Sequence, residues 1–545
     1  MRSKVTVGII LFSLYIISQW ESIHPAEMLL LLSMLIFVPI TWELTDQHKR
    51  DGQRMRLAKV LAIFYVPAVL SAYFAIIGHF TILACIWFAY TICASLFGVF
   101  RLLERGVRPI AEVAIDSGWM YLGLGGFWFF AYVSELPIMH FSRETILLTV
   151  IHFHYSAFII PIISGLLGRK ISEKNSLYSF ILMLIIVSPM TIAVGITYSR
   201  WIEFIAVVVY AVALYMYGFF VVQADFRNKS AKLLVSFSSA VLLVTIFFSF
   251  LYAYGRLGFS GGVTIKQMIF IHGVVNAFGV VLPALIGWLI EGTSNGRAYY
   301  GKPMSLIFGD SIISERFLTR EKLIDERTYH GLVDDMEHFC SKHFDKQKLA
   351  PSISQFYEQT ENYQLKAFIQ WASWFKPLAF LYEKVSRHVQ QIHLSAGGRW
   401  EMMTGEVVAV QSSKDGREHV RAWVRNNDKG ETIFVALYSQ HTYKDETYMN
   451  IALPLPFSNM TGILRFENEG KNLILSSKGR TTGNGDEGIY LRTPLAVIRL
   501  PLAETFIIKE KSADQLMAHH QMWIFGVKFL EINYEIEKRA VEESS

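Results

Sequence analysis

Long apolar runs follow one another through the first 290 residues, with only short polar segments between them. A helix needs about 20 mostly apolar residues to cross the hydrocarbon core of a bilayer. Ten runs approach or exceed that length, at residues 5–20, 27–43, 58–77, 80–100, 111–133, 145–167, 176–197, 202–222, 233–254 and 267–290. No small-residue cleavage site follows the first run, so we expect an uncleaved helix there. Residues 1–292 therefore predict a membrane bundle of about ten transmembrane helices.

Basic residues are divided unequally between the two sets of alternate connections. Four basic residues lie on one side: Arg143, Arg200, Arg256 and Lys266. Sixteen lie on the other: Arg2, Lys4, Lys49, Arg50, Arg54, Arg56, Lys59, Arg101, Arg105, Arg108, Arg169, Lys170, Lys174, Arg227, Lys229 and Lys232. Lys and Arg concentrate in cytoplasmic loops. The pattern predicts a multi-pass protein of the cell membrane with both termini cytoplasmic, and its regular alternation supports ten spans.

The charge balance changes where the apolar runs stop. Residues 1–290 hold 20 Lys and Arg against 13 Asp and Glu, and the remaining residues hold 31 against 33. The net charge of +5 thus comes from the membrane half, where basic loops are expected. Since the second half has no basic block, we expect the lipid bilayer as a partner and no nucleic acid.

The polar half predicts a cytosolic α+β domain. Residues 293–350 read as a linker with short helices, and 351–396 have helical spacing at Leu365, Phe368, Ile369, Ala372 and Phe375. Residues 401–508 alternate with period two between turn clusters, which predicts an antiparallel sheet, curved or closed into a barrel. Residues 512–541 favour a covering helix, with further strands as the alternative. A packed core is the commoner interior of such a sheet, and an enclosed apolar ligand is the alternative.

Three histidines lie inside the apolar runs. His152 and His154 are two residues apart, so on a helix they point about 200° from each other and do not share one ligand. The tenth run, which carries His272, enters the membrane from the same side as the sixth run, which carries His152. We therefore expect the two histidines at similar depth. Two neutral imidazoles from facing helices suit a transition metal or the axial positions of a haem. The alternative is that each histidine hydrogen-bonds a neighbouring helix.

Carboxylates and one amide also lie within the runs. Glu112 and Asp116 are four residues apart on one helical face, and Asn276 follows His272 at the same spacing. Intramembrane carboxylates often handle ions or protons. We therefore predict a ligand or ion path that includes Glu112, Asp116 and Asn276. Solvation by nearby headgroups is the alternative explanation for Glu112.

Several segments carry a resemblance to a known family. "IHFHYSAF" and a later "IHGVVNAFG" precede a polar region that contains "RAWVRN" and "YMNIALPLPFSNMTG". Together they resemble the YndJ-like family of membrane proteins, across most of the chain. The resemblance implies a multi-pass protein of the cell membrane. It implies no activity and no catalytic residues.

The leading functional hypothesis is that the membrane bundle binds or transports a small or lipophilic molecule, with the cytosolic domain regulating it or binding ligand. A membrane oxidoreductase that holds a metal or haem between His152 and His272 is the first alternative. A non-catalytic scaffold or sensor is the second. The sequence shows no Walker A loop, GxSxG or HExxH motif. Substrate, oligomeric state and enzymatic activity stay open.

Overall fold

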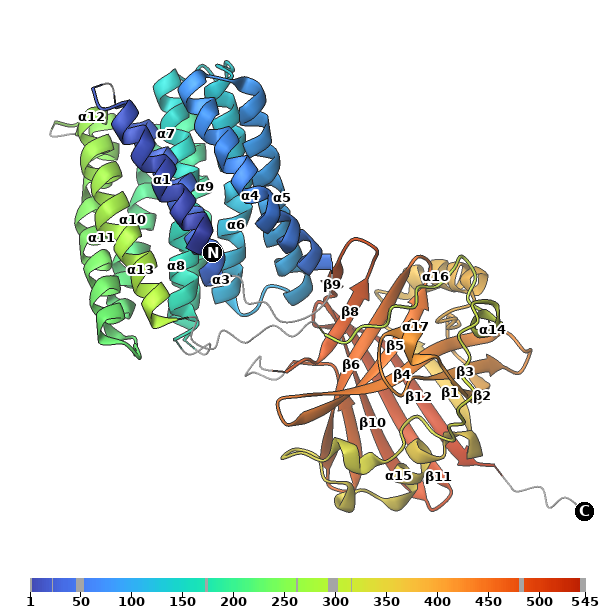
Figure 1. Ribbon diagram of the computed structural model, residues 1–545. Helices are drawn as coiled ribbons and strands as arrows, with labels where there is room; N and C mark the ends of the chain where they lie inside the picture. The colour runs from blue at the N-terminus through green and yellow to red at the C-terminus, as the bar shows by residue number, and fades with distance from the viewer. Residues whose placement is uncertain are drawn as a thin grey trace, which may run out of the picture. The chain divides into compact units, whose positions relative to one another are not determined.

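The computed structural model describes residues 2–21, 23–45, 53–171, 175–260, 263–292, 302–314, 316–479 and 485–539. Residues 293–301 of the predicted linker, 540–541 of the predicted C-terminal segment, and Lys49, Arg50 and Lys174 lie outside them. The chain divides into two compact units, residues 1–301 and 302–545. The first unit is helical and the second is built on a β-sheet (Figure 1).

The helical unit has a helical segment at each of the ten predicted runs. Its elements are α1 (Arg2–Ser18), α2 (Pro25–Leu32), η1 (Ser33–Phe37), α3 (Val38–Thr45), α4 (Gln53–Gly78), α5 (Thr81–Arg105), α6 (Ile110–Val133), α7 (Arg143–His154), α8 (Ile159–Gly168), α9 (Ser176–Tyr198), α10 (Arg200–Gln223), α11 (Lys229–Arg256), α12 (Ile265–Gln267), η2 (Met268–Val274), η3 (Asn276–Val281) and α13 (Leu282–Glu291).

Eight helices within the described ranges are long and apolar enough to cross a membrane. Several of these segments are continuous helices made of two or more elements, such as Pro25–Thr45 and Ile265–Glu291. The apolar helix at the N-terminus is shorter, and α6, with Glu112 and Asp116 in its first two turns, is outside the eight. Large apolar side chains such as Ile82 and Leu233 are exposed on the outside of the bundle, as lipid contact requires. The apolar bundle makes this a membrane protein.

Three helical segments are widened or interrupted just before a proline. The π-helical turn η1 precedes Pro39, the turn between α7 and α8 precedes Pro161, and the π-helical stretch η2–η3 precedes Pro283. Proline has no amide hydrogen, and its ring collides with the carbonyl four residues earlier. The preceding turn relieves that collision by widening, and such wide turns are frequent at functional sites. The span predicted over 145–167 is present as Arg143–Gly168, with turns at residues 155–158.

The second unit is an antiparallel barrel. Its strands are β1 (Tyr363–Trp371), β2 (Trp400–Ala409), β3 (Arg421–Asn427), β4 (Thr432–Tyr443), β5 (Glu446–Leu455), β6 (Ser458–Glu469), β7 (Asn472–Ser476), β8 (Gly488–Arg492), β9 (Val497–Arg499), β10 (Leu502–Ser512), β11 (Gln515–Ile524) and β12 (Val527–Lys538). The order is β5-β4-β3-β2-β1-β12-β11-β10-β7-β6-β8-β9, and β5 also pairs with β6. That extra pairing closes the sheet, leaving β8 and β9 as an extension of β6 (Figure 1).

Short helices accompany the barrel. They are α14 (Phe317–Arg320), η4 (Met336–Phe339), η5 (Lys346–Lys348), α15 (Pro351–Glu358), η6 (Thr360–Asn362), α16 (Lys376–Val389) and α17 (Ser412–Asp415). The described part of the predicted linker belongs to this unit, because Met336 and Phe339 are buried in the core of the barrel. Burial of these side chains holds the segment on the barrel.

The helix predicted across residues 351–396 is wrong at its centre, where the chain forms β1. Leu365 and Ile369 satisfy both a helical and a strand period, but the observed burial alternates from Tyr363 to Trp371. Hydrogen-bonded pairing with β2 and β12 makes this segment a strand. The C-terminal segment forms β11 and β12, the strand alternative. Phe525 and Gly526, both at positive φ, make the tight turn between these strands.

Candidate functional site

A cavity of about 640 Å³ lies inside the helical unit. Three residues from the predicted site line it: His152 from α7, His272 from η2 and Asn276 from η3. Leu29 from α2 and Tyr155 from the turn after α7 also line it, and the Tyr155 hydroxyl donates to the Leu29 carbonyl at 2.6 Å. The turn between α7 and α8 and the π-helical stretch η2–η3 thus meet at this cavity. Irregular backbone at membrane depth is tolerated where it lines a cavity.

His152 hydrogen-bonds to α9. Its Nε2 lies 3.1 Å from the carbonyl oxygen of Pro189. A carbonyl only accepts, so Nε2 carries the proton of the neutral imidazole. Among the described residues, His152 hydrogen-bonds through Nε2, which leaves Nδ1 as an acceptor. His152 therefore offers a lone pair at the cavity wall.

His272 belongs to a polar network with α11. The Thr245 hydroxyl donates to Asn276 Oδ1, which orients the Asn276 amide nitrogen toward His272 Nδ1 at 3.1 Å. Nδ1 also lies 3.1 Å from Ser249 Oγ and 3.2 Å from the Thr245 carbonyl, and Nε2 lies 3.2 Å from Ser249 Oγ. The network fixes the ring and presents neutral hydrogen-bonding groups.

His154 lies away from this cavity, as its position two residues after His152 predicts. Its Nδ1 donates to the Val150 carbonyl at 2.9 Å, and its ring stacks near Trp87 with centroids 6.3 Å apart. Gly125 faces the ring so closely that a Cβ there would be 2.9 Å from His154. His154 packs helices together and satisfies a local hydrogen bond.

Further polar groups that the sequence analysis did not assign also line the cavity. Ser156 donates to the Tyr210 hydroxyl at 3.1 Å, and Arg256 pairs with buried Glu203 at 3.0 Å. The charges of these residues could have revealed part of this lining from the sequence. Glu203 is an acid within an apolar run, and Arg256 is one of the four basic residues on the basic-poor side, so their pairing was open to prediction.

Glu112 and Asp116 do not line this cavity. They lie together among three arginines. Asp116 is fully buried, with Oδ1 2.7 Å from Arg101 Nε and a second contact to Arg105. Glu112 accepts from Arg169 Nε at 2.6 Å and from Arg101 at 3.0 Å. The cluster ties α5, α6 and the end of α8 together by buried ion pairs.

The bundle and its cavity define the class, a multi-pass membrane protein that is followed in the chain by a closed antiparallel barrel. A family model described as YndJ-like protein matches residues 28–280. The chain is 46% identical over 536 residues to "Uncharacterized membrane protein YndJ" of Bacillus subtilis (strain 168), covering 98% of each chain. The chain belongs to the YndJ-like family. No solved structure matches it.

Proposed function

We propose that the helical unit binds a small lipophilic molecule in the cavity lined by His152 and His272. The observation that carries this proposal is a cavity of about 640 Å³ whose wall is mostly apolar and includes the polar side chains of His152, Ser249 and His272. Ligand sites have this composition and fall in the same size range, roughly 300–1,000 Å³.

The polar groups select the chemical class. His152 Nδ1 accepts, and the Ser249 hydroxyl is placed to donate or accept beside His272. The Glu203 carboxylate already has a guanidinium partner in Arg256. A neutral molecule with a hydroxyl or carbonyl group matches these partners, since a charged group would enter without a free counter-charge among the described lining residues.

The proposal places this cavity in the cell membrane. Ten spans with both termini cytoplasmic follow from the distribution of basic residues, and the barrel is then cytosolic. Single cysteines introduced at Asn228 and at Ser142 test this topology in intact cells with a membrane-impermeant thiol reagent. The topology predicts labelling at Ser142 only, and labelling at Asn228 would contradict it.

Ligand binding is tested with a photoreactive long-chain alcohol on the full chain in lipid nanodiscs. We expect cross-links to residues of the cavity wall and roughly ten-fold weaker labelling in His152→Ala, because the ligand hydroxyl loses the Nδ1 acceptor. His79→Ala, at an exposed histidine, is the matched control. Equal labelling in both variants would contradict the site.

A second candidate is a membrane oxidoreductase, favoured by the two imidazoles on one cavity wall. Within the described ranges no group of three or more His, Cys, Asp or Glu side chains is placed to hold a metal, so a metal or haem would depend on these two histidines. Absorbance in the Soret region and metal analysis of the purified protein decide between the candidates. A folded, colourless and metal-free preparation supports lipophile binding.

The predicted role of Glu112 and Asp116 in an ion path is a separate hypothesis. Their contacts with Arg101, Arg105 and Arg169 favour a structural role. The two roles differ in what neutralising Asp116 does to folding, which is developed in the Discussion.

A further inference from the structure

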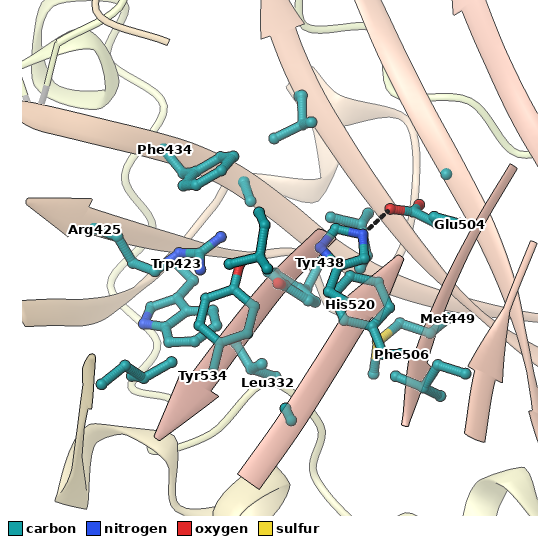
Figure 2. Close-up of a pocket in the computed structure, with 18 of the residues that line it drawn as sticks. Leu332, Trp423, Arg425, Phe434, Tyr438, Met449, Glu504, Phe506, His520 and Tyr534 are labelled. Atoms are coloured by element: carbon teal, nitrogen blue, oxygen red, sulfur yellow. Dashed lines mark hydrogen bonds and ion pairs between the residues drawn. The ribbon is translucent and has the colours of Figure 1, made fainter. Parts of the chain in front are cut away.

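The interior of the barrel holds a second cavity, of about 140 Å³ (Figure 2). Most of its wall is apolar, including Leu332, Met449 and Phe506. Ionisable side chains also line it: Arg425, Glu504 and His520. Charged groups are rarely buried without a partner, so the partners of each decide what the cavity is built to hold.

Arg425 is a buried cation without a carboxylate partner among the described residues. It is 8% exposed, and no acidic oxygen of the described chain lies within 4.0 Å of it. Its guanidinium lies 4.1 Å from the centroid of Phe434 and 4.5 Å from that of Trp423, and Figure 2 shows the two rings on either side of it. Its Nε has no hydrogen-bond partner, and the rest of its guanidinium donates to the Tyr534 hydroxyl.

The strands direct Arg425 into the barrel. Phe434 on β4 and Gly405 on β2 are its direct neighbours across the sheet. Trp423 and Arg425 are two residues apart on β3, so they share the face that lines the cavity. Gly405 leaves space that the Trp423 indole occupies, because a Cβ at Gly405 would lie 2.4 Å from Nε1. Local backbone geometry therefore holds an aromatic box around the guanidinium.

The acidic group in the cavity has its own partner. Glu504 accepts from His520 Nε2 at 3.1 Å, and the His520 ring stacks on Phe506 with centroids 3.7 Å apart (Figure 2). Gly462 makes room for this carboxylate, since a Cβ there would lie 2.6 Å from Glu504 Oε1. Glu504 is thus engaged with His520 and forms no ion pair with Arg425.

Two tyrosines complete the polar lining. Burial raises the pKa of Tyr438 to about 12 and holds that of Tyr534 above its ordinary value. Both hydroxyls therefore stay protonated at neutral pH and act as hydrogen-bond donors. A cation flanked by neutral donors in an apolar chamber is suited to an anion.

We propose that the barrel binds a small monocarboxylic acid with a compact apolar body, its carboxylate paired with Arg425. The guanidinium fork matches a carboxylate bidentately. The apolar wall accommodates the body of the acid, and an apolar cavity of about 150 Å³ holds a molecule the size of benzene. Closed antiparallel barrels commonly enclose one small ligand in this way. The site is independent of the cavity in the helical unit.

Calorimetric titration of the full chain in detergent tests the proposal with two matched probes, benzoate and its neutral isostere benzamide. We expect benzoate to bind and benzamide to bind roughly ten- to hundred-fold more weakly, as the loss of a charge-assisted hydrogen bond requires. Hexanoate in place of benzoate reports whether a short acyl body is accepted. Equal affinities for benzoate and benzamide, or no binding of either acid at millimolar concentration, would overturn the proposal.

Variants assign the effect to Arg425. Arg425→Gln is expected to bind benzoate no better than benzamide, and Arg425→Lys to retain a preference for the acid because it keeps the positive charge. Arg399→Gln is the matched control, since that arginine is exposed and pairs with Glu401. Near-ultraviolet circular dichroism verifies that each variant is folded. A folded Arg425→Gln protein that keeps wild-type affinity and preference would refute the assignment, and the comparison of benzoate with benzamide on the wild-type chain stands without any variant.

Discussion

Neutralising Asp116 by Asp116→Asn is expected to destabilise the helical unit. The Asp116 carboxylate is fully buried, 2.7 Å from Arg101 Nε and in contact with Arg105. Among the described residues, the cluster contains three guanidiniums and the two carboxylates of Glu112 and Asp116, a formal charge of +1. The substitution raises this charge to +2, and all three guanidiniums then contact the single remaining carboxylate of this set, Glu112.

The size of the effect follows from burial. Removing one partner of a buried ion pair costs about 3–5 kcal/mol, because the other charge stays desolvated. At about 1.4 kcal/mol per factor of ten, this corresponds to a rise of roughly 100- to 3,000-fold in the unfolding equilibrium constant. The exposed pair of Glu135 and Arg143 gives the contrast. An exposed pair contributes about 0.2–1 kcal/mol, so Glu135→Gln is the matched control.

Thermal unfolding of the full chain in one detergent, followed by helical circular dichroism, measures both variants. We expect a clearly lowered midpoint for Asp116→Asn and a nearly unchanged midpoint for Glu135→Gln. An Asp116→Asn protein that unfolds like the wild type would refute the structural role. If such a stable variant also lost ion-coupled uptake into vesicles, the predicted ion path through Asp116 would gain support.

Two predictions concern the barrel. Hydrogen bonds from Lys528 and His519 hold the pKa of Glu531 at about 2, below its ordinary 4.5, so their stabilisation is complete above pH 4.5 and is lost as the pH falls toward 2. Glu531→Gln should therefore show a smaller drop in unfolding temperature over that range than Glu535→Gln; equal drops would contradict this. Gly405→Ala should lower the free energy of unfolding by about 1–3 kcal/mol, because its Cβ would press on Trp423. Denaturant titration measures the change, and an unaltered midpoint would show that the indole moves freely.

The positions of the membrane helices were predictable because apolar length is a one-dimensional property of the chain. The widened turns were harder to predict, since hydropathy does not show where a helix departs from regular α-helical geometry. Pro39, Pro161 and Pro283 each follow a widened or interrupted turn, but Pro67 and Pro189 lie within regular α-helices, so proline alone does not predict these turns. The shared cavity of His152 and His272 depends on how distant helices pack, which spacing within one helix does not report.

Most strands of the barrel were predictable from the sequence, but the cavity around Arg425 was not. Leu365 and Ile369 fit helix and strand equally, so only pairing with β12 and β2 decides the structure of that segment. Arg425 was also hidden, because a charged residue in an alternating segment is ordinarily assigned to the solvent side. Arg425 shares one face of β3 with Trp423, and that face becomes the interior only because the sheet closes into a barrel.

The order of the strands bears on when the barrel is completed during synthesis. Most strands pair with the strand made just before or after them, so they assemble as the chain emerges. The pairings β6–β8 and β7–β10 skip one or two strands, and the pairing of β1 with β12 spans the whole sheet, since it joins Tyr363 to Lys538. Until the ribosome has made β12, one edge of β1 has no partner and the chamber around Arg425 has an open seam. The barrel can therefore hold a ligand only after β12 has been made and paired, when all ten helical runs have already been translated.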